Sequence, residues 1–272
     1  MLKSKMGSVP FLVWSIIFIL VPLGLVVFYS FSAKDGSGFT LENILRIGDY
    51  SSIFIKSINL ALIATFICLI LAYPFAWLLS RMEEKKQGIM MLLVMLPMWM
   101  NFLLRTYGWM NLIENEGIIN KLFGLIGVGP FQMINTQGAV VLGMVYNYLP
   151  FMITPLHSVM VKIDKSTIEA AQDLGAGFWN TLFRVQLPLS LPGIISGITM
   201  VFVPSVSTFI ISKMLGGGSN MLIGDLIEQQ FLGSTYNPYL GSAISLILMV
   251  IMLLLMGIMN AFDDNEMEGM VM

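Results

Sequence analysis

The stretch that decides the fold reads EAAQDLG at residues 169–175 and is followed about a dozen residues later by Leu187-Pro188. Long apolar runs lie on both sides of it. Such runs can cross a membrane, where a polar segment would find no water to hydrogen-bond its backbone. We therefore expect residues 162–188 to form an ordered loop between two spans, outside the membrane.

The composition indicates a membrane protein. Hydrophobic residues make up 57% of the 272-residue chain and charged residues 11%, whereas a soluble domain has roughly 45–50% and 25%. Several runs exceed the ~18 apolar residues that indicate a membrane-spanning helix. We predict an all-α membrane protein with a single transmembrane domain over residues 1–272.

Six apolar segments are long enough to cross about 30 Å of hydrocarbon at about 1.5 Å per residue. The predicted transmembrane helices cover, within a few residues, 10–31, 53–80, 89–113, 138–161, 189–212 and 239–262. We expect the first to be retained, because its apolar run exceeds the roughly 7–15 residues of a signal peptide. Prolines inside the segments remove backbone donors and are expected to bend the helices. They are Pro74, Pro97, Pro150, Pro155 and Pro204.

Residues suited to catalysis or metal binding are scarce. The chain has one cysteine, Cys68, and one histidine, His157, each within an apolar segment. We expect no disulfide, no metal site and no catalytic residue, and we interpret Cys68 as a small buried apolar residue. The run of glycines at 216–218 is not followed by Lys and Ser or Thr, so it does not match a phosphate-binding loop. The chain is not expected to be an enzyme or to bind nucleic acid.

The distribution of Lys and Arg predicts the orientation. With both termini in the cytoplasm, basic residues favour the inner segments over the outer loops by about two to one, as the positive-inside rule requires. The inner set is Lys3, Lys5, Arg81, Lys85, Lys86, Lys162, Lys165 and Arg184, and the outer set is Lys34, Arg46, Lys121 and Lys213. In this orientation the loop at 162–188 faces the cytoplasm.

Local signals predict two helices within this loop. Ser166 and Glu169 have the spacing of a capping box, and Asp164 is a competing N-cap. Gly175 or Gly177 can take the left-handed conformation that ends a helix. A second amphipathic run follows, with Phe178, Leu182 and Val185 near one face, and Pro188 marks the start of the fifth span.

The loop resembles the cytoplasmic loop of ABC-importer permeases, in which Glu-Ala-Ala, a later Gly and an apolar-Pro pair recur. Spans two to six are similar to the core of the type I permeases. Within that superfamily the chain most resembles the B-type permease subunit of spermidine/putrescine importers. The longer matches are RTYGW at 105–109, LPFM at 149–152, LGA at 174–176, LIGDLI at 222–227 and QFL at 230–232.

The resemblance implies an assembly in a bacterial cytoplasmic membrane. It would contain an ATPase dimer, a second homologous permease, an extracytoplasmic substrate-binding protein and surrounding lipid. ATP and Mg would be bound by the partner ATPase, and this chain would hold no cofactor. The residues implied in coupling to the ATPase are Glu169, Ala170, Ala171, Asp173, Gly175, Leu187 and Pro188.

A polyamine is a flexible polycation, so its path needs aromatic faces and polar groups. The candidates for this path are Trp99, Asn101, Tyr107, Tyr146, Asn147 and Thr208. Aromatic residues near span ends are also typical of the membrane-interface belt, and hydroxyls beside Pro204 can serve a packed kink. Residues 222–231 predict an amphipathic outer helix, on which Asp225 and Glu228 are candidate contacts for the binding protein.

Two other classes of transporter differ in the sequence features that they require. An ABC importer of another small solute, such as an amino acid, iron or another cation, would share the Glu-Ala-Ala loop. An ion-coupled secondary transporter would not need that loop and would need an intramembrane carboxylate for proton coupling, which the spans lack. The loop therefore favours the ATP-driven importer.

Overall fold

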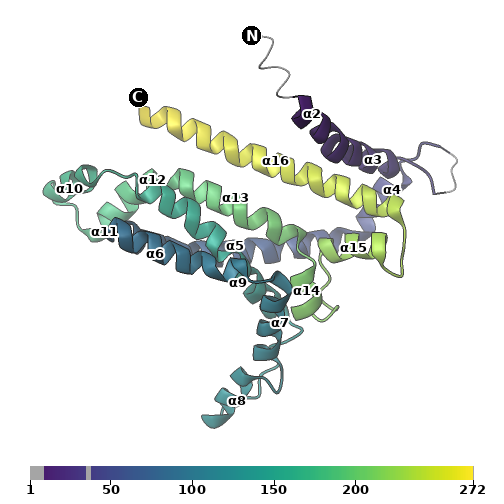
Figure 1. Ribbon diagram of the computed structural model, residues 1–272, viewed down its shortest axis with the longest axis horizontal. Coiled ribbons are helices and arrows are strands. Elements are labelled where there is room, and N and C mark those ends of the chain that lie inside the picture. Colours follow the sequence, from purple (N-terminus) through teal and green to yellow (C-terminus); the bar gives the residue numbers. More distant parts are fainter. Residues whose placement is uncertain (1–8, 35–37, 272) are drawn as a thin grey trace. The chain divides into compact units, whose positions relative to one another are not determined.

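The computed structural model describes residues 9–34 and 38–271. Helices make up 79% of it, and its β-structure is limited, within those residues, to an isolated bridge between Ser32 and Phe39 (Figure 1). The prediction of an all-α protein is confirmed. Lys3 and Lys5 lie outside the described residues.

The number of membrane spans agrees with the prediction when broken helices are counted as spans. Four helices of the described residues are long and apolar enough to cross a membrane: Pro10–Ser30, Glu42–Ser80, Gln137–Met160 and Pro238–Met259. Two further pairs of helices are long and apolar enough only when each pair is taken together, and each pair is bent at a short break. The bend is 89° between Glu84–Trp99 and Phe102–Leu125, and 65° between Phe178–Leu189 and Leu191–Ser207. Each pair counted as one span gives six.

The chain forms two compact units, and the expected single domain stays a prediction. Unit 1 comprises Met1–Phe54 and Leu226–Leu254, and unit 2 comprises Ile55–Asp225 and Leu255–Met272. Three helices contribute to both units: α5 (Ser51–Ser80), α15 (Ile223–Leu232) and α16 (Pro238–Val271). The other helices of unit 1 are α2 (Val9–Ser15), the π-helix η1 (Ile16–Leu20), α3 (Val21–Ser30), α4 (Glu42–Leu45) and the 3-10 helix η2 (Arg46–Tyr50).

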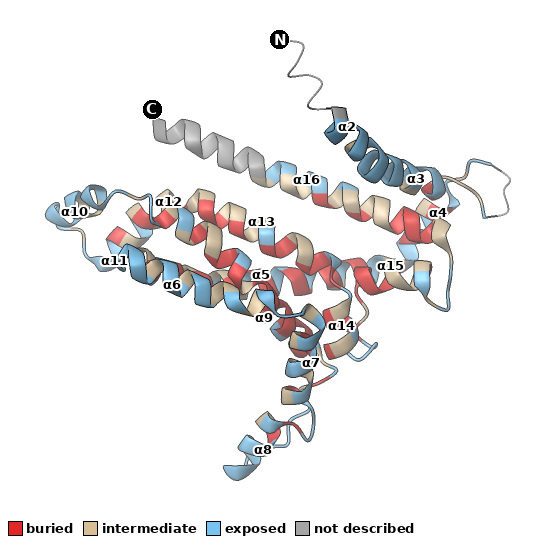
Figure 2. Cartoon of the chain, in the orientation of Figure 1, coloured by how far each residue is buried: buried red, intermediate tan, exposed pale blue. Residues whose placement is uncertain are grey.

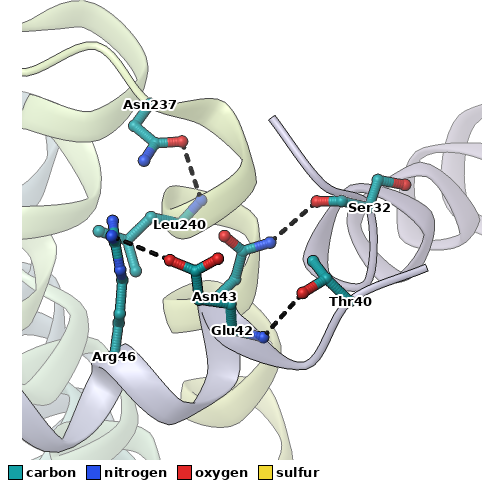
Figure 3. Close-up of polar contacts among 7 residues, drawn as sticks. All are labelled: Ser32, Thr40, Glu42, Asn43, Arg46, Asn237 and Leu240. Carbon is teal, nitrogen blue, oxygen red and sulfur yellow. Dashed lines mark hydrogen bonds and ion pairs between the residues drawn. The ribbon is translucent and has the colours of Figure 1, made fainter. Parts of the chain in front are cut away.

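In unit 1 the first span, Pro10–Ser30, is almost entirely exposed, as its colouring in Figure 2 shows. Short-range polar contacts organise the turn that follows it (Figure 3). Asn43 donates to the carbonyl oxygens of Ser30 (3.2 Å) and Ser32 (3.0 Å). Asn237 caps α16, because its Oδ1 accepts from the Leu240 N–H (3.3 Å) and Pro238 occupies the first helical position.

Unit 2 contains the loop and path residues. Its helices begin with the inner part of α5 and continue with α6 (Glu84–Met95), η3 (Leu96–Trp99), α7 (Phe102–Ile113), α8 (Ile118–Leu125), α9 (Gln137–Met160), α10 (Lys165–Asp173), α11 (Phe178–Thr181), η4 (Leu182–Gln186), α12 (Leu187–Leu189), α13 (Leu191–Ser207) and α14 (Ile210–Leu215). The loop helix α10 lies at one end of this unit, away from α14 (Figure 1).

Small residues let the helices of unit 2 approach closely, as is typical of membrane helix pairs. Gly193 and Gly197 of α13 lie against α9, where an added Cβ would stand 3.0 Å from the Pro155 carbonyl oxygen and 2.6 Å from the Met152 sulfur. A fully buried stripe of small residues follows one face of α5. It consists of Ala61, Ala64, Cys68, Ala72 and Ala76. Cys68 is therefore a buried packing residue, as predicted.

The third predicted span, 89–113, is broken in the structure, just after Pro97, where the sequence predicts a bend. A 3-10 turn ends the first part at Trp99, and Met100 and Asn101 are extended. The Asn101 side chain accepts from the N–H groups of Leu103 (2.9 Å) and Leu104 (3.3 Å) and so starts α7 as its N-cap. Hydropathy is continuous across this break and does not reveal it.

The fifth predicted span, 189–212, also has different ends. Its main helix starts at Leu191 and stops at Ser207, because Thr208 has the extended backbone angle ψ of 141°. Pro188 lies in the three-residue helix α12 and does not start α13; Pro192 stands at the start of α13 instead. The chain continues as the short helix α14 after Thr208.

Candidate functional site

The loop between α9 and α13 starts with a capped helix. The Asp164 carboxylate accepts from the Ser166 N–H (3.1 Å), which makes Asp164 the N-cap of α10. The predicted capping box of Ser166 and Glu169 is wrong, because Ser166 lies within the helix. Asp164 pairs one of the free N–H groups in the first turn of the helix. A cap at Ser166 would instead start the helix two residues later.

The helix ends in a turn that depends on Gly175. The Gly175 N–H bonds the Gln172 carbonyl (2.9 Å) and the Ala176 N–H bonds the Ala171 carbonyl (3.0 Å), which are the two bonds of a Schellman motif. Gly175 has φ of +84°, whereas Gly177 has φ of −68°. Of the two predicted turn glycines, Gly175 is the one in the left-handed conformation.

The structure separates the predicted coupling residues into two groups. Glu169, Ala170, Asp173 and Gly175 are exposed on α10 and its turn, and Ala171 is half-buried there. Leu174 projects from the same turn and is 90% exposed. Leu187 and Pro188 are half-buried in α12, and Leu187 packs against the hydrophobic core. The first group forms an accessible surface, and the second joins the loop to the unit.

In the segment that returns from α10 to α13, two of the three residues predicted near one face, Leu182 and Val185, are half-buried. Phe178 is exposed, while Thr181 and Gln186 are buried. A π-helical turn over Leu182–Gln186 shifts the helical face relative to a regular 3.6-residue repeat. Sequence reasoning missed Gln186 and its partner Trp77 on α5, although a glutamine in an apolar run is a signal for a polar contact.

The path candidates on the third span are accessible. Trp99 is 75% and Tyr107 50% exposed, and Asn101 is exposed at the break between η3 and α7. The amide of Asn101 serves as the helix cap described above. Their role in substrate passage stays a prediction.

The path candidates on the fourth and fifth spans are more enclosed. Tyr146 stands edge-to-face with Trp109, with 5.2 Å between ring centroids. Asn147 is 2% exposed; its Nδ2 donates to the Gly143 carbonyl (2.8 Å), and its Oδ1 has no hydrogen-bond partner. Thr208 is 6% exposed at the broken end of α13. A path at these residues therefore requires a state in which Asn147 and Thr208 become accessible.

The helix predicted at residues 222–231 is present as α15 (Ile223–Leu232), but one of its candidate contacts is buried. Asp225 is 7% exposed, and its Oδ2 accepts from the Leu222 N–H (2.8 Å). In this conformation it supports the start of α15, and its contact with a binding protein stays a prediction. Glu228 is half-buried, and its proposed contact stays a prediction.

Within the residues that the structure describes, no three His, Cys, Asp or Glu side chains gather in a group that could hold a metal ion. The features that stand out are an exposed capped helix between two spans and two helices broken within the apolar region. Discontinuous helices of this kind place polar backbone groups along membrane pathways.

Residues 72–265 match the family described as binding-protein-dependent transport system inner membrane component, and the chain belongs to this family. It is a membrane permease of an ABC importer and a multi-pass protein of the cytoplasmic membrane. It is a transport component and not a catalytic enzyme.

Named relatives agree with this membership. The chain is 41% identical over 251 residues to the spermidine/putrescine transport system permease protein PotB of Haemophilus influenzae, covering 89% of this chain and 87% of that protein. It is 38% identical over 248 residues to PotB of Escherichia coli, covering 88% and 90%. The fold is similar to a solved bacterial ABC transporter involved in the import of alginate, with a TM-score of 0.77 and 16% identity over 97% of this chain and 95% of that one.

Proposed function

We propose that this chain is the permease subunit of an ATP-driven importer of polyamines such as spermidine or putrescine. The observation that carries the proposal is the 41% identity to a spermidine/putrescine permease over 89% of this chain. Exposed aromatic side chains on the third span, Trp99 and Tyr107, suit a polycation, because ring faces attract ammonium groups.

The energy would come from a partner ATPase that binds ATP and Mg. The exposed surface of α10, with Glu169, Ala170 and Asp173, offers it a docking surface. Both termini would lie in the cytoplasm, as the Lys and Arg distribution predicts. A second permease subunit and an extracytoplasmic binding protein would complete the assembly.

The test is uptake of radiolabelled spermidine by the complete assembly in proteoliposomes. We expect uptake that requires hydrolysable ATP and is reduced by excess unlabelled putrescine. Uptake driven by an ion gradient without ATP would overturn the ATP-driven mechanism. ATP-dependent uptake of an amino acid or iron, with none of spermidine, would overturn the polyamine assignment alone.

A further inference from the structure

Two polar contacts join the end of α5 to the segment that returns from the loop. The Trp77 indole N–H donates to Gln186 Oε1. One turn away in both segments, the Tyr73 hydroxyl lies 3.3 Å from the Ser190 hydroxyl oxygen. Ser190 itself donates to the Leu187 carbonyl (2.9 Å), so Tyr73 is the donor. Because the residues of each segment are four apart, the bonds form a ladder of two rungs.

The Trp77 side chain of this ladder has further contacts besides its hydrogen bond. The Phe178 ring stands edge-to-face with Trp77 at 5.7 Å between centroids, and the Arg81 guanidinium carbon lies 4.0 Å from the ring centroid. The acceptors are deeply enclosed, with Gln186 5% and Ser190 0% exposed. Loss of either donor would therefore leave a buried polar group without its partner, which is costly.

A cavity of about 100 Å³ lies beside the ladder. Trp77 and Gln186 line it, together with Lys165 and Ile168 of α10 and Met160 at the end of α9. The cavity leaves a gap in the packing between α10 and the ends of α5 and α9. The ladder, in contrast, ties the returning segment to α5 by directional bonds.

We propose that the ladder of Trp77–Gln186 and Tyr73–Ser190 transmits movement of the α10–α12 segment to α5. The proposal rests on the proposed function, since it assumes that an ATPase moves this segment. Two hydrogen bonds on successive turns resist both sliding and rotation, because a shift of one segment would have to break both. Trp77 and Tyr73 are positioning residues, which act through the backbone of α5 and touch neither ATP nor solute.

The test compares single and double removal of one rung. Trp77→Phe keeps an aromatic ring but removes the donor, and Gln186→Met keeps the length of the side chain but removes the acceptor. The double variant removes both, so no buried group loses its partner. Trp14→Phe, on the first span, is the matched control for loss of an indole N–H.

We expect both single variants to lower the thermal stability of the purified assembly and the double variant to recover most of it. Coupling should not recover. Coupling is measured as ATPase activity with spermidine-loaded binding protein divided by activity without it, and we expect this ratio to fall about fivefold in the double variant. A double variant whose coupling returns to the wild-type ratio together with its stability would show a structural role alone and overturn the proposal.

A second readout does not depend on the solute. Ile55 is 60% exposed near the far end of α5, about 30 Å from Trp77 along the helix. In a Cys68→Ala background, Ile55→Cys should change its rate of maleimide labelling when ATP is added. The double variant should lose this change, and persistence of the change would contradict the ladder. If spermidine is not transported, this readout still tests the ladder while the polyamine assignment fails.

Discussion

Gly224 at the start of α15 lies so close to the carbonyl oxygen of Ser207 that no side chain fits between them. A Cβ on Gly224 would stand 2.5 Å from this oxygen and 2.5 Å from the Thr208 carbonyl oxygen. These carbonyls belong to the broken end of α13, where the helix stops at Ser207. A backbone acceptor cannot rotate away as a flexible side chain can, so the contact requires glycine.

Gly224→Ala should therefore destabilise the protein by about 1–3 kcal/mol, because one methyl group must displace backbone. The measurement is the thermal unfolding midpoint of the purified protein in detergent. Gly108→Ala in α7 is the matched control, since nothing lies within 4 Å of its added Cβ. Equal midpoints for the two variants would contradict the close contact.

Gly175→Val should uncouple the permease while leaving it inserted in the membrane. Its φ of +84° is strained for any residue with a Cβ, at a cost of about 1–2 kcal/mol, and worse for a β-branched one. Nothing lies within 4 Å of the added Cβ, so the effect would come from the backbone. The measurements are co-purification of the ATPase and spermidine uptake.

Gly175→Asn is the matched variant, because asparagine tolerates the left-handed conformation better than other non-glycine residues. We expect it to retain most of the coupling that Gly175→Val loses. Normal transport by the valine variant would show that the Schellman turn is dispensable. An equal loss of coupling in both variants would indicate that the docking surface itself cannot accept a side chain at this position.

Asp164→Ala should loosen the first turn of α10, because it removes the N-cap, at a cost of about 1 kcal/mol. Ser166→Ala should have little effect, since the structure gives Ser166 no capping role. Amide hydrogen exchange of residues 166–169 in the purified protein separates the two variants. Faster exchange in Ser166→Ala than in Asp164→Ala would contradict the Asp164 cap and support the capping box of Ser166 and Glu169.

The predicted apolar segments correspond to long apolar helices or bent helix pairs in the structure, because apolar length is a property of composition. The sequence predicted bends at the nearby Pro97 and Pro204, but it did not predict that the helices stop at Trp99 and Ser207. Asn101 is an N-cap within an apolar region, and averaging over a window of residues conceals one such position. Pro97 and Asn101 together were the signal: a proline favours the end of one helix, and an asparagine favours the N-cap of the next.

In the loop, local chemistry predicted the turn at Gly175 but left two N-cap candidates open, because Asp164 and Ser166 both have suitable side chains. The ladder could not be predicted from one sequence. Trp77 and Gln186 are 109 residues apart, and Tyr73 and Ser190 are 117 apart. Contacts at such separations depend on how the helices pack, which hydropathy does not determine.

Trp99→Ala and Asn147→Leu should both slow spermidine uptake without loss of assembly. Trp99 is 75% exposed, and its ring can attract an ammonium group by roughly 0.5–2 kcal/mol, so truncation should slow uptake by about twofold to thirtyfold. Leu103→Ala, 46% exposed on α7, is the control for loss of apolar surface.

Asn147→Leu is the more decisive of the two variants, because uptake should stay normal if Asn147 is only a packed core residue and should fall if it lines the path. The Asn147 Oδ1 is buried without a partner, so in a packed core an apolar replacement removes an unsatisfied group and costs only the Nδ2 bond to the Gly143 carbonyl. If Asn147 instead meets water or substrate when the path opens, the same change removes a needed polar group, and uptake falls although stability changes little. Uptake at the wild-type rate in both Asn147→Leu and Trp99→Ala, at equal expression, would refute the path through the third and fourth spans.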